Sequence, residues 1–194
     1  MRRILFASRN EGKIREAQAI LGSSNVKLVS IRDFPDMPEV VEDGKNFFEN
    51  ALKKAKTLSE FSGIPTIADD SGLEVDCLDG RPGVHSARYA GTNATDGDNI
   101  ERLLEEMKGI PQENRKAAFK CVLVLYETDG SYHHFEGLFE GSIAEAPSGT
   151  GGFGYDPVFL PAGENKTVAE MDPETKNSIS HRGRAFDKLK KYLK

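Results

Sequence analysis

The chain has 194 residues, of which 38% are hydrophobic and 29% are charged, and its formal net charge is -5. This composition is typical of a soluble globular protein and excludes a disordered, fibrous or repetitive chain. The negative charge argues against an open nucleic-acid platform, because such surfaces hold phosphates through basic patches. We therefore expect a single folded domain over residues 1–194, which can consist of two closely packed lobes.

The sequence favours a cytoplasmic protein. The apolar run Ile4-Leu5-Phe6-Ala7 ends before Ser8 and is too short for the core of a signal peptide. No run approaches the roughly 18 apolar residues of a membrane-spanning helix. Cys77 and Cys121 lie far apart without CxxC spacing, which favours a reducing compartment and argues against a metal-binding pair.

The first third of the chain alternates strands and helices. Residues 3–7 and 26–31 have the apolar character of strands, and residues 12–21 between them place apolar side chains on one helical stripe. Residues 33–38 contain two prolines and are predicted to be irregular. Residues 46–61 form the clearest helix in this part, with phenylalanines, alanines and leucines on one face.

The later segments predict a mixed sheet. Residues 66–68 read as a short buried strand, and residues 99–108 as a helix. Residues 117–126 form the strongest strand, and a turn leads to a partner strand at 132–138, which makes a hairpin. In a final helix, Ser180 is the expected N-cap, and the expected apolar residues are Phe186, Leu189, Tyr192 and Leu193. The fold class is therefore α/β, a mixed β-sheet flanked by helices, in one folding unit that can contain two lobes and a cleft.

An acidic stretch follows the short strand. "IADDSGLEVD" places Asp69 and Asp70 side by side after an apolar run, and like charges so close imply something positive opposite them. Mg²⁺ takes one or two protein carboxylates together with phosphate oxygens, so this pair, with Glu42 as a more distant candidate, fits a magnesium site. The alternative is a solvated turn after the strand, which Asp-Ser-Gly also favours.

Two further motifs suit a nucleotide. "SRNEGK" lies between the first strand and the first helix, where free N–H groups suit phosphate, although Ser8 or Asn10 can equally cap the helix. "GTGGFG" matches a dinucleotide-binding pattern in its letters, but the segment after it cannot be helical. Its glycines instead allow a ligand to approach, and Phe153 offers an aromatic face to a purine; a flexible loop is the alternative.

The fourth motif is "KNSISHRG". His181 and Arg182 fall at the start of the last helix, where positive charge is unfavourable unless an anion lies nearby. That anion would be phosphate or a base carbonyl, and the alternative is an exposed helix start. His133 and His134 are neighbours on a strand and point to opposite faces, so they cannot share one metal ion.

Taken together, these motifs resemble the inosine triphosphate pyrophosphatase family. The resemblance extends over roughly residues 5–184 and rests on five blocks in order: "SRNEGK", "FFENALKKA", "IADDSGLEVDCLDGRPGVHSARYAG", "GTGGFGYDPVF" and "KNSISHRG". It implies an elongated mixed sheet with two lobes and a central cleft, as a homodimer. It also implies Mg²⁺-dependent hydrolysis of ITP, dITP and XTP to the monophosphate and pyrophosphate, which cleanses the nucleotide pool.

The resemblance also implies residue roles. Asp70 would be the proton acceptor and a metal ligand, with Glu42 as a second ligand and Asp69 supporting Asp70 from the side. Arg9 departs from the family pattern, since its position often holds a small residue. The substrate-binding residues would be Ser8, Arg9, Asn10, Glu11, Gly12, Lys13, Lys54, Ser71, Phe153, Gly154, Tyr155, Asp156, Lys176, His181 and Arg182.

Two rival functions remain at this stage. A related pyrophosphatase for modified pyrimidine nucleotides would share the general architecture, but Phe153 and the Ser-His-Arg block favour purines. A sensor that binds nucleotides without cleaving them would gain little from Asp69 and Asp70, because extra negative charge opposes polyphosphate binding.

Overall fold

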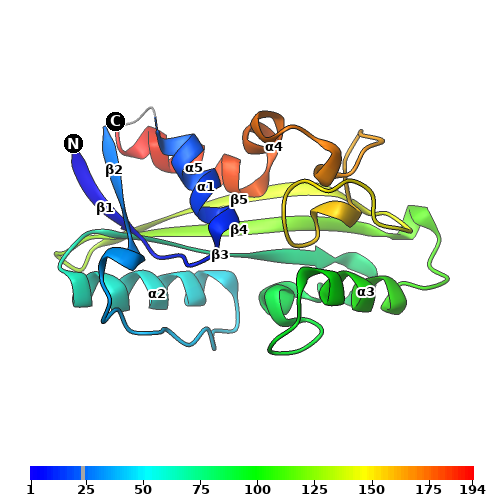
Figure 1. The fold of residues 1–194 in the computed structure, drawn as a ribbon, viewed down its shortest axis with the longest axis horizontal. Helices are drawn as coiled ribbons and strands as arrows, with labels where there is room; N and C mark the ends of the chain where they lie inside the picture. The colour runs from blue at the N-terminus through cyan, green and yellow to red at the C-terminus, as the bar shows by residue number, and fades with distance from the viewer. Residues whose placement is uncertain (23–24) are drawn as a thin grey trace. The chain divides into compact units, whose positions relative to one another are not determined.

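The structure is a computed structural model that describes residues 1–22 and 25–194, and it has a mixed α/β architecture (Figure 1). The strands form a six-stranded sheet in the order β2-β1-β3-β4-β5-β6. This confirms the α/β class with a mixed sheet flanked by helices. The strands are β1 (Arg2–Phe6), β2 (Val26–Ser30), β3 (Thr66–Val75), β4 (Lys116–Tyr126), β5 (Tyr132–Ile143) and β6 (Phe159–Pro161). The helices are α1 (Glu11–Leu21), α2 (Phe47–Ser62), α3 (Asp96–Glu106), α4 (Pro173–Ile179) and α5 (His181–Tyr192).

The chain divides into two compact units. Strands β3, β4 and β5 each contribute residues to both. Unit 1 comprises Met1–Asp70, Cys121–Gly137 and Arg182–Lys194, and unit 2 comprises Ser71–Lys120 and Leu138–His181.

Unit 1 is built on parallel strands. β1 pairs in parallel with both β2 and β3, with Leu5 opposite Thr66 and Phe6 opposite Ile67. Helices α1 and α5 cover one face of these strands and α2 covers the other (Figure 1). The central strands β1 and β3 bury most of their residues, as expected for parallel strands covered on both faces, whereas the edge strand β2 buries only Val29. The core beneath α1 and α5 contains Ile4, Phe6, Ala17, Leu21, Ile67, Cys121, Leu123, Leu125, Ala185, Phe186 and Leu189.

The two helices that begin in unit 1 have well-defined ends. The side chains of Asn10 and Asn46 accept hydrogen bonds from the backbones of Lys13 and Glu49, which caps α1 and α2. α2 ends at Gly63, whose φ of 67° is left-handed and suits glycine. Both helices confirm the sequence prediction, because capping and apolar periodicity are local signals.

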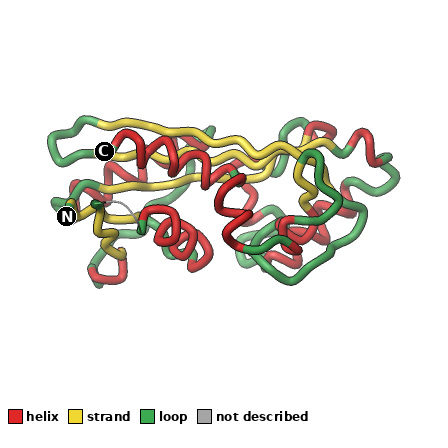
Figure 2. Tube along the Cα trace, turned by 90° about the horizontal axis from the view of Figure 1, so that it is seen from above, coloured by secondary structure: helices red, strands yellow, loops and turns green. Residues whose placement is uncertain are grey.

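Unit 2 has its own core around α3. β6 pairs antiparallel with the end of β5, and loops and short helical turns make up much of the unit (Figure 2). α3 begins with a capping box between Thr95 and Asp98 and buries Ile100 and Leu103. The core consists of Leu73, Val75, Leu78, Tyr89, Ile100, Leu103, Met107, Ala117, Phe119, Phe139, Ile143, Tyr155, Val158, Phe159 and Val168.

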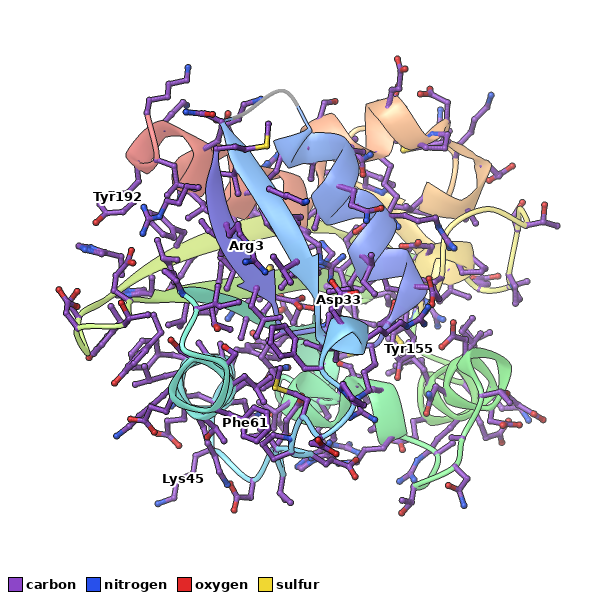
Figure 3. All side chains as sticks on the ribbon, turned by 60° about the vertical axis from the view of Figure 1, so that its left-hand side comes forward. Arg3, Asp33, Lys45, Phe61, Tyr155 and Tyr192 are labelled. Carbon is purple, nitrogen blue, oxygen red and sulfur yellow. The ribbon has the colours of Figure 1, made fainter. Side chains whose placement is uncertain are left out.

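One sequence prediction was wrong in a way that matters. The strand predicted at 66–68 is the ten-residue β3, so Asp69 and Asp70 lie within a strand and not in a turn after it. The strand continues because buried partners offset the charges of these carboxylates. Tyr192 was expected on the apolar side of the last helix; it lies near the end of α5 (Figure 3) and is 47% exposed, and its ring contacts those of His133 and Phe135 on β5.

The other predicted elements differ from the structure only at their ends, whereas β6 and α4 were not predicted. β5 runs to Ile143, past the expected residue 138, and α3 begins at Asp96, ahead of residue 99. Within the part of the chain that the structure describes, no helix is long and apolar enough to cross a membrane.

The unit 2 core predicts a large stability effect at Leu103. Leu103 is 0% exposed, so Leu103→Ala should lower the free energy of unfolding by about 2–5 kcal/mol through lost burial and a cavity. Leu138 in the same unit is 39% exposed, and Leu138→Ala should cost at most about 0.5 kcal/mol. Urea denaturation measures both; equal losses would mean that this core is misassigned.

Candidate functional site

Asp69 and Asp70 lie on opposite faces of the sheet. Consecutive side chains in a strand alternate between the two faces, and both residues belong to β3. Asp69 contacts α1 and α5, whereas Asp70 contacts α2 on the other face (Figure 1). The two carboxylates therefore make different direct contacts, although Lys13 and Lys54 lower the pKa of both. This corrects the expectation that Asp69 supports Asp70 from the side.

Asp69 joins two cations. Its Oδ2 lies 2.9 Å from Lys13 Nζ and accepts from Nε and Nη2 of Arg182, both at 3.4 Å. Arg182 Nη1 also donates to Glu16 on α1. Burial raises the pKa of Asp69, but Lys13, Arg182 and Lys54 outweigh it and hold that pKa well below its usual range. The positive charge expected opposite the acidic pair thus lies opposite Asp69.

Asp70 has a more neutral environment. Its Oδ2 accepts a hydrogen bond from Asn50 Nδ2 at 2.9 Å. Burial raises its pKa, and Lys54, Lys13 and Asn50 offset this only in part, while the nearby Glu42 raises it further. A buried carboxyl group with a raised pKa is suited to accept a proton.

Lys54 lies between the acidic groups on the α2 side. Its Nζ donates to Glu42 Oε1 and to the backbone carbonyl of Asp69, both at 2.7 Å. Burial lowers the pKa of Lys54, but Asp69, Glu42 and Asp70 outweigh it and raise the pKa. Lys54 therefore keeps its charge while fixing the position of Glu42.

The Asp70 side of β3 fits a divalent cation. Asp70 and Glu42 interact unfavourably with each other, and Lys54 supplies one positive charge to the pair. Oxygen ligands of this kind are those that Mg²⁺ accepts, with phosphate oxygens and water completing its shell. Within residues 1–22 and 25–194, no group of three or more His, Cys, Asp or Glu side chains has a metal-holding arrangement.

The "SRNEGK" motif forms the start of α1. Asn10 caps the helix, and Ser8 Oγ accepts from the Asn10 backbone N–H at 3.2 Å, so the structural alternative holds for Asn10. Lys13 points to Asp69, and Glu11 pairs with Arg32 on the surface. The exposed Arg9 and the buried Gly12 complete the segment. Phosphate binding here remains a prediction.

The aromatic motif in unit 2 is a braced loop. The Phe153 N–H donates to Asp156 Oδ2 at 2.8 Å, and the Gly154 N–H donates to Asp96 Oδ2 at 2.6 Å. The buried Tyr155 donates from its hydroxyl to the Ser86 carbonyl at 2.9 Å. The loop is therefore ordered around Phe153, in contrast to the flexible loop that was the alternative.

The cation Lys176 lies beside this loop. Lys176 Nζ lies 2.6 Å from Asp156 Oδ2 and 4.5 Å from the centroid of the Phe153 ring. This cation–π contact covers one face of the ring. His181, also in unit 2, is buried and stacks on Phe119 with the ring planes 10° apart and the centroids 4.8 Å apart. Ser71, half-buried, follows Asp70 on β3.

The sequence analysis did not identify four residues that contact the candidate site residues. Glu16 lies three residues after Lys13 on α1, and Asn50 lies four before Lys54 on α2, so helical spacing placed each beside a predicted residue. Ser86 and Asp96 gave no such signal, because their partners are 69 and 58 residues away in the chain.

Comparison with known proteins identifies relatives over the whole chain. The model of the Ham1 family matches residues 4–192. A protein from Geobacter sulfurreducens named dITP/XTP pyrophosphatase is 52% identical over 193 residues, covering 100% of this chain and 97% of that protein.

Solved structures also match nearly the whole chain. A HAM1 protein from Coxiella burnetii is 41% identical with a TM-score of 0.91, covering 100% of this chain and 98% of that one. A Mycobacterium abscessus structure, described as a nucleoside-triphosphatase / dITP/XTP pyrophosphatase, is 45% identical with a TM-score of 0.79, covering 99% and 100%.

The Asp69 network predicts a loss of stability on neutralisation. Asp69→Asn leaves Lys13 and Arg182 without their shared carboxylate in a buried site, and breaking such a pair costs about 3–5 kcal/mol. Asp43→Asn is the matched control, because Asp43 pairs with Lys53 at the surface and should change nothing measurable. Chemical denaturation of both variants measures this. Equal stability of Asp69→Asn and wild type would contradict the network.

Proposed function

Because the chain belongs to the Ham1 family, we propose that it hydrolyses the nonstandard purine triphosphates ITP, dITP and XTP to the nucleoside monophosphate and pyrophosphate. The names of its relatives support this activity, which would cleanse the nucleotide pool. The observation that carries the proposal is Asp70, a buried carboxyl group with a raised pKa beside Lys54 and Glu42. A binding protein for polyphosphate has no need of such a group.

Unit 1 would act on the phosphates. Lys13 and Lys54 are held in place by Asp69, through its side chain and its backbone carbonyl respectively, and both would contact phosphate oxygens. The start of α1 at Ser8 and Asn10 adds backbone N–H groups and the positive end of the helix dipole. These groups fix the triphosphate and neutralise charge that develops on the leaving pyrophosphate.

Asp70 would act on the attacking water. It orients the water and accepts its proton as the water oxygen forms a bond to the α-phosphorus. The bond from that phosphorus to the bridging oxygen breaks, and pyrophosphate leaves with the electron pair. Asn50 holds Asp70 through its side-chain amide and so fixes the direction of the free carboxylate oxygen.

Asp70 and Glu42 would hold Mg²⁺. When bound, the ion supplies charge neutralisation at the phosphate oxygens. Lys54 already fixes the Glu42 carboxylate, so the two protein ligands come from groups whose positions are set in advance.

Unit 2 would recognise the base. The face of Phe153 opposite Lys176 would stack on the purine, with Gly154, Tyr155 and Asp156 beside it. Lys176 and His181 are the candidate donors to the 6-keto group. A donor aimed at that oxygen would be left unpaired by the amino group of adenine, which disfavours ATP. The homodimer remains a prediction from the resemblance, and the cytoplasmic location remains a prediction from the sequence.

The proposal is tested by product analysis. Purified protein is incubated with dITP, XTP, dUTP, ATP and GTP, with Mg²⁺ or with EDTA, and pyrophosphate is separated from orthophosphate. Pyrophosphate from dITP and XTP, with Mg²⁺ and with ATP and GTP spared, is the expected result. Release of orthophosphate would indicate a different chemistry. A preference for dUTP would favour the pyrophosphatase for modified pyrimidine nucleotides. Tight dITP binding without products would favour the nucleotide sensor.

The substitution Asp70→Asn should lower catalytic turnover without disturbing the fold. The amide oxygen can still accept from Asn50, so the fold should persist, but the proton acceptor is lost and turnover should fall by about 10²–10⁴-fold. Steady-state dITP hydrolysis and thermal melting measure this. The control is Asp36→Asn, at an exposed position, which should match wild type. Near-normal turnover in Asp70→Asn would remove Asp70 from the mechanism.

A further inference from the structure

One hydrogen bond ties the first turn of α3 to the loop that carries Phe153. Asp96 Oδ2 accepts from the Gly154 backbone N–H at 2.6 Å, although the two residues are 58 positions apart. A carboxylate that accepts from a backbone N–H makes a stronger bond than a neutral acceptor. Sequence motifs did not point to Asp96, and the proposed function does not use it.

The bond falls between two other anchored residues of the loop. Phe153 is held by Asp156 within the loop, and Tyr155 is held by Ser86. Gly154 lies between them with a φ of 61°, a left-handed conformation that only glycine adopts freely. Rotation of this peptide would swing the Phe153 ring relative to Tyr155, and the Asp96 bond opposes that rotation.

α3 is a firm base for this contact. The capping box of Thr95 and Asp98 fixes its first turn, while Leu103 and Met107 are fully buried. Asp96 follows Thr95 directly, so its carboxylate starts from a fixed backbone. A carboxylate in the first turn also interacts favourably with the helix dipole, which by itself would account for an acidic residue here without any role in the loop.

We propose that Asp96 is a positioning residue, which holds the Gly154 backbone and thereby the Phe153 ring in the orientation that receives the purine base. The inference rests on the proposed function, because it assigns the base to Phe153. Asp96 contacts no reacting atom. It acts by ordering the ring before substrate binds, and so reduces the ordering that binding itself must bring about.

The test separates base binding from phosphate binding. Asp96→Ala should raise the KM for dITP about fivefold, the size expected for one hydrogen bond, with kcat within about twofold of wild type. Tripolyphosphate carries no base, so its inhibition constant should not change. Asp96→Asn keeps an acceptor oxygen and should restore a KM close to that of wild type.

The matched control lies in the same helical turn. Asp98 accepts from the Thr95 backbone N–H and hydroxyl, both at 2.7 Å, and no hydrogen bond joins it to the loop among those of the described residues. Asp98→Ala should therefore lower the melting temperature by weakening α3 and leave the KM for dITP unchanged. A purely structural role for Asp96 would make the two variants alike.

Three results would overturn the proposal. The first is an unchanged KM in Asp96→Ala. The second is a lowered KM in Asp96→Ala, which would mean that Asp96 competes with substrate for the Gly154 N–H. The third is an equal rise in KM in Asp98→Ala. If wild type hydrolyses no purine triphosphate, the proposed function has failed separately. Calorimetry with dITP then makes the same comparison through dissociation constants, and a wild type that does not bind dITP overturns both.

Discussion

The ion pairs of Asp69 are the interaction on which unit 1 depends. One carboxylate oxygen, almost fully shielded from water, binds Lys13 of α1 and Arg182 of α5, so it joins both helices to β3. A buried charge without partners is strongly unfavourable, and three groups here satisfy one another only in this arrangement. The same contacts fix the direction of the Lys13 side chain, while the Asp69 carbonyl fixes Lys54. A single residue thus orders two cations that the proposed reaction needs.

The alternation of side chains along β3 gives the neighbouring carboxyl group a different task. Asp70 faces α2, where burial raises its pKa, whereas cations hold the pKa of Asp69 well below its usual range. Two identical side chains one residue apart thereby differ in protonation behaviour, because Asp69 contacts cations directly whereas Asp70 contacts the amide of Asn50. Asp69 is suited to hold the structure, and Asp70 is suited to accept a proton. An acid–base site requires such a difference between its carboxyl groups.

Local signals predicted most of the fold. α1, α2 and β4 follow from apolar periodicity and caps, which depend on residues near one another in the chain. β3 was predicted too short, because Asp69-Asp70-Ser71-Gly72 has the composition of a turn and only tertiary partners make it a strand. The motifs identified Lys13, Asp70 and Phe153 as candidates. They could not show that Arg182 binds Asp69, 113 residues away, or that Asp96 holds Gly154.

The central claim is that the two faces of β3 divide the work between Asp70 and Asp69, and metal binding tests it most directly. Mn²⁺ replaces Mg²⁺ in an electron paramagnetic resonance titration with the non-hydrolysable α,β-methylene analogue of dITP, well below the melting temperature of each variant. The account predicts that Asp70→Asn weakens Mn²⁺ binding by about tenfold or more, whereas Asp69→Asn leaves it within a few-fold of wild type. Equal weakening in both variants, or loss in Asp69→Asn alone, would contradict the division.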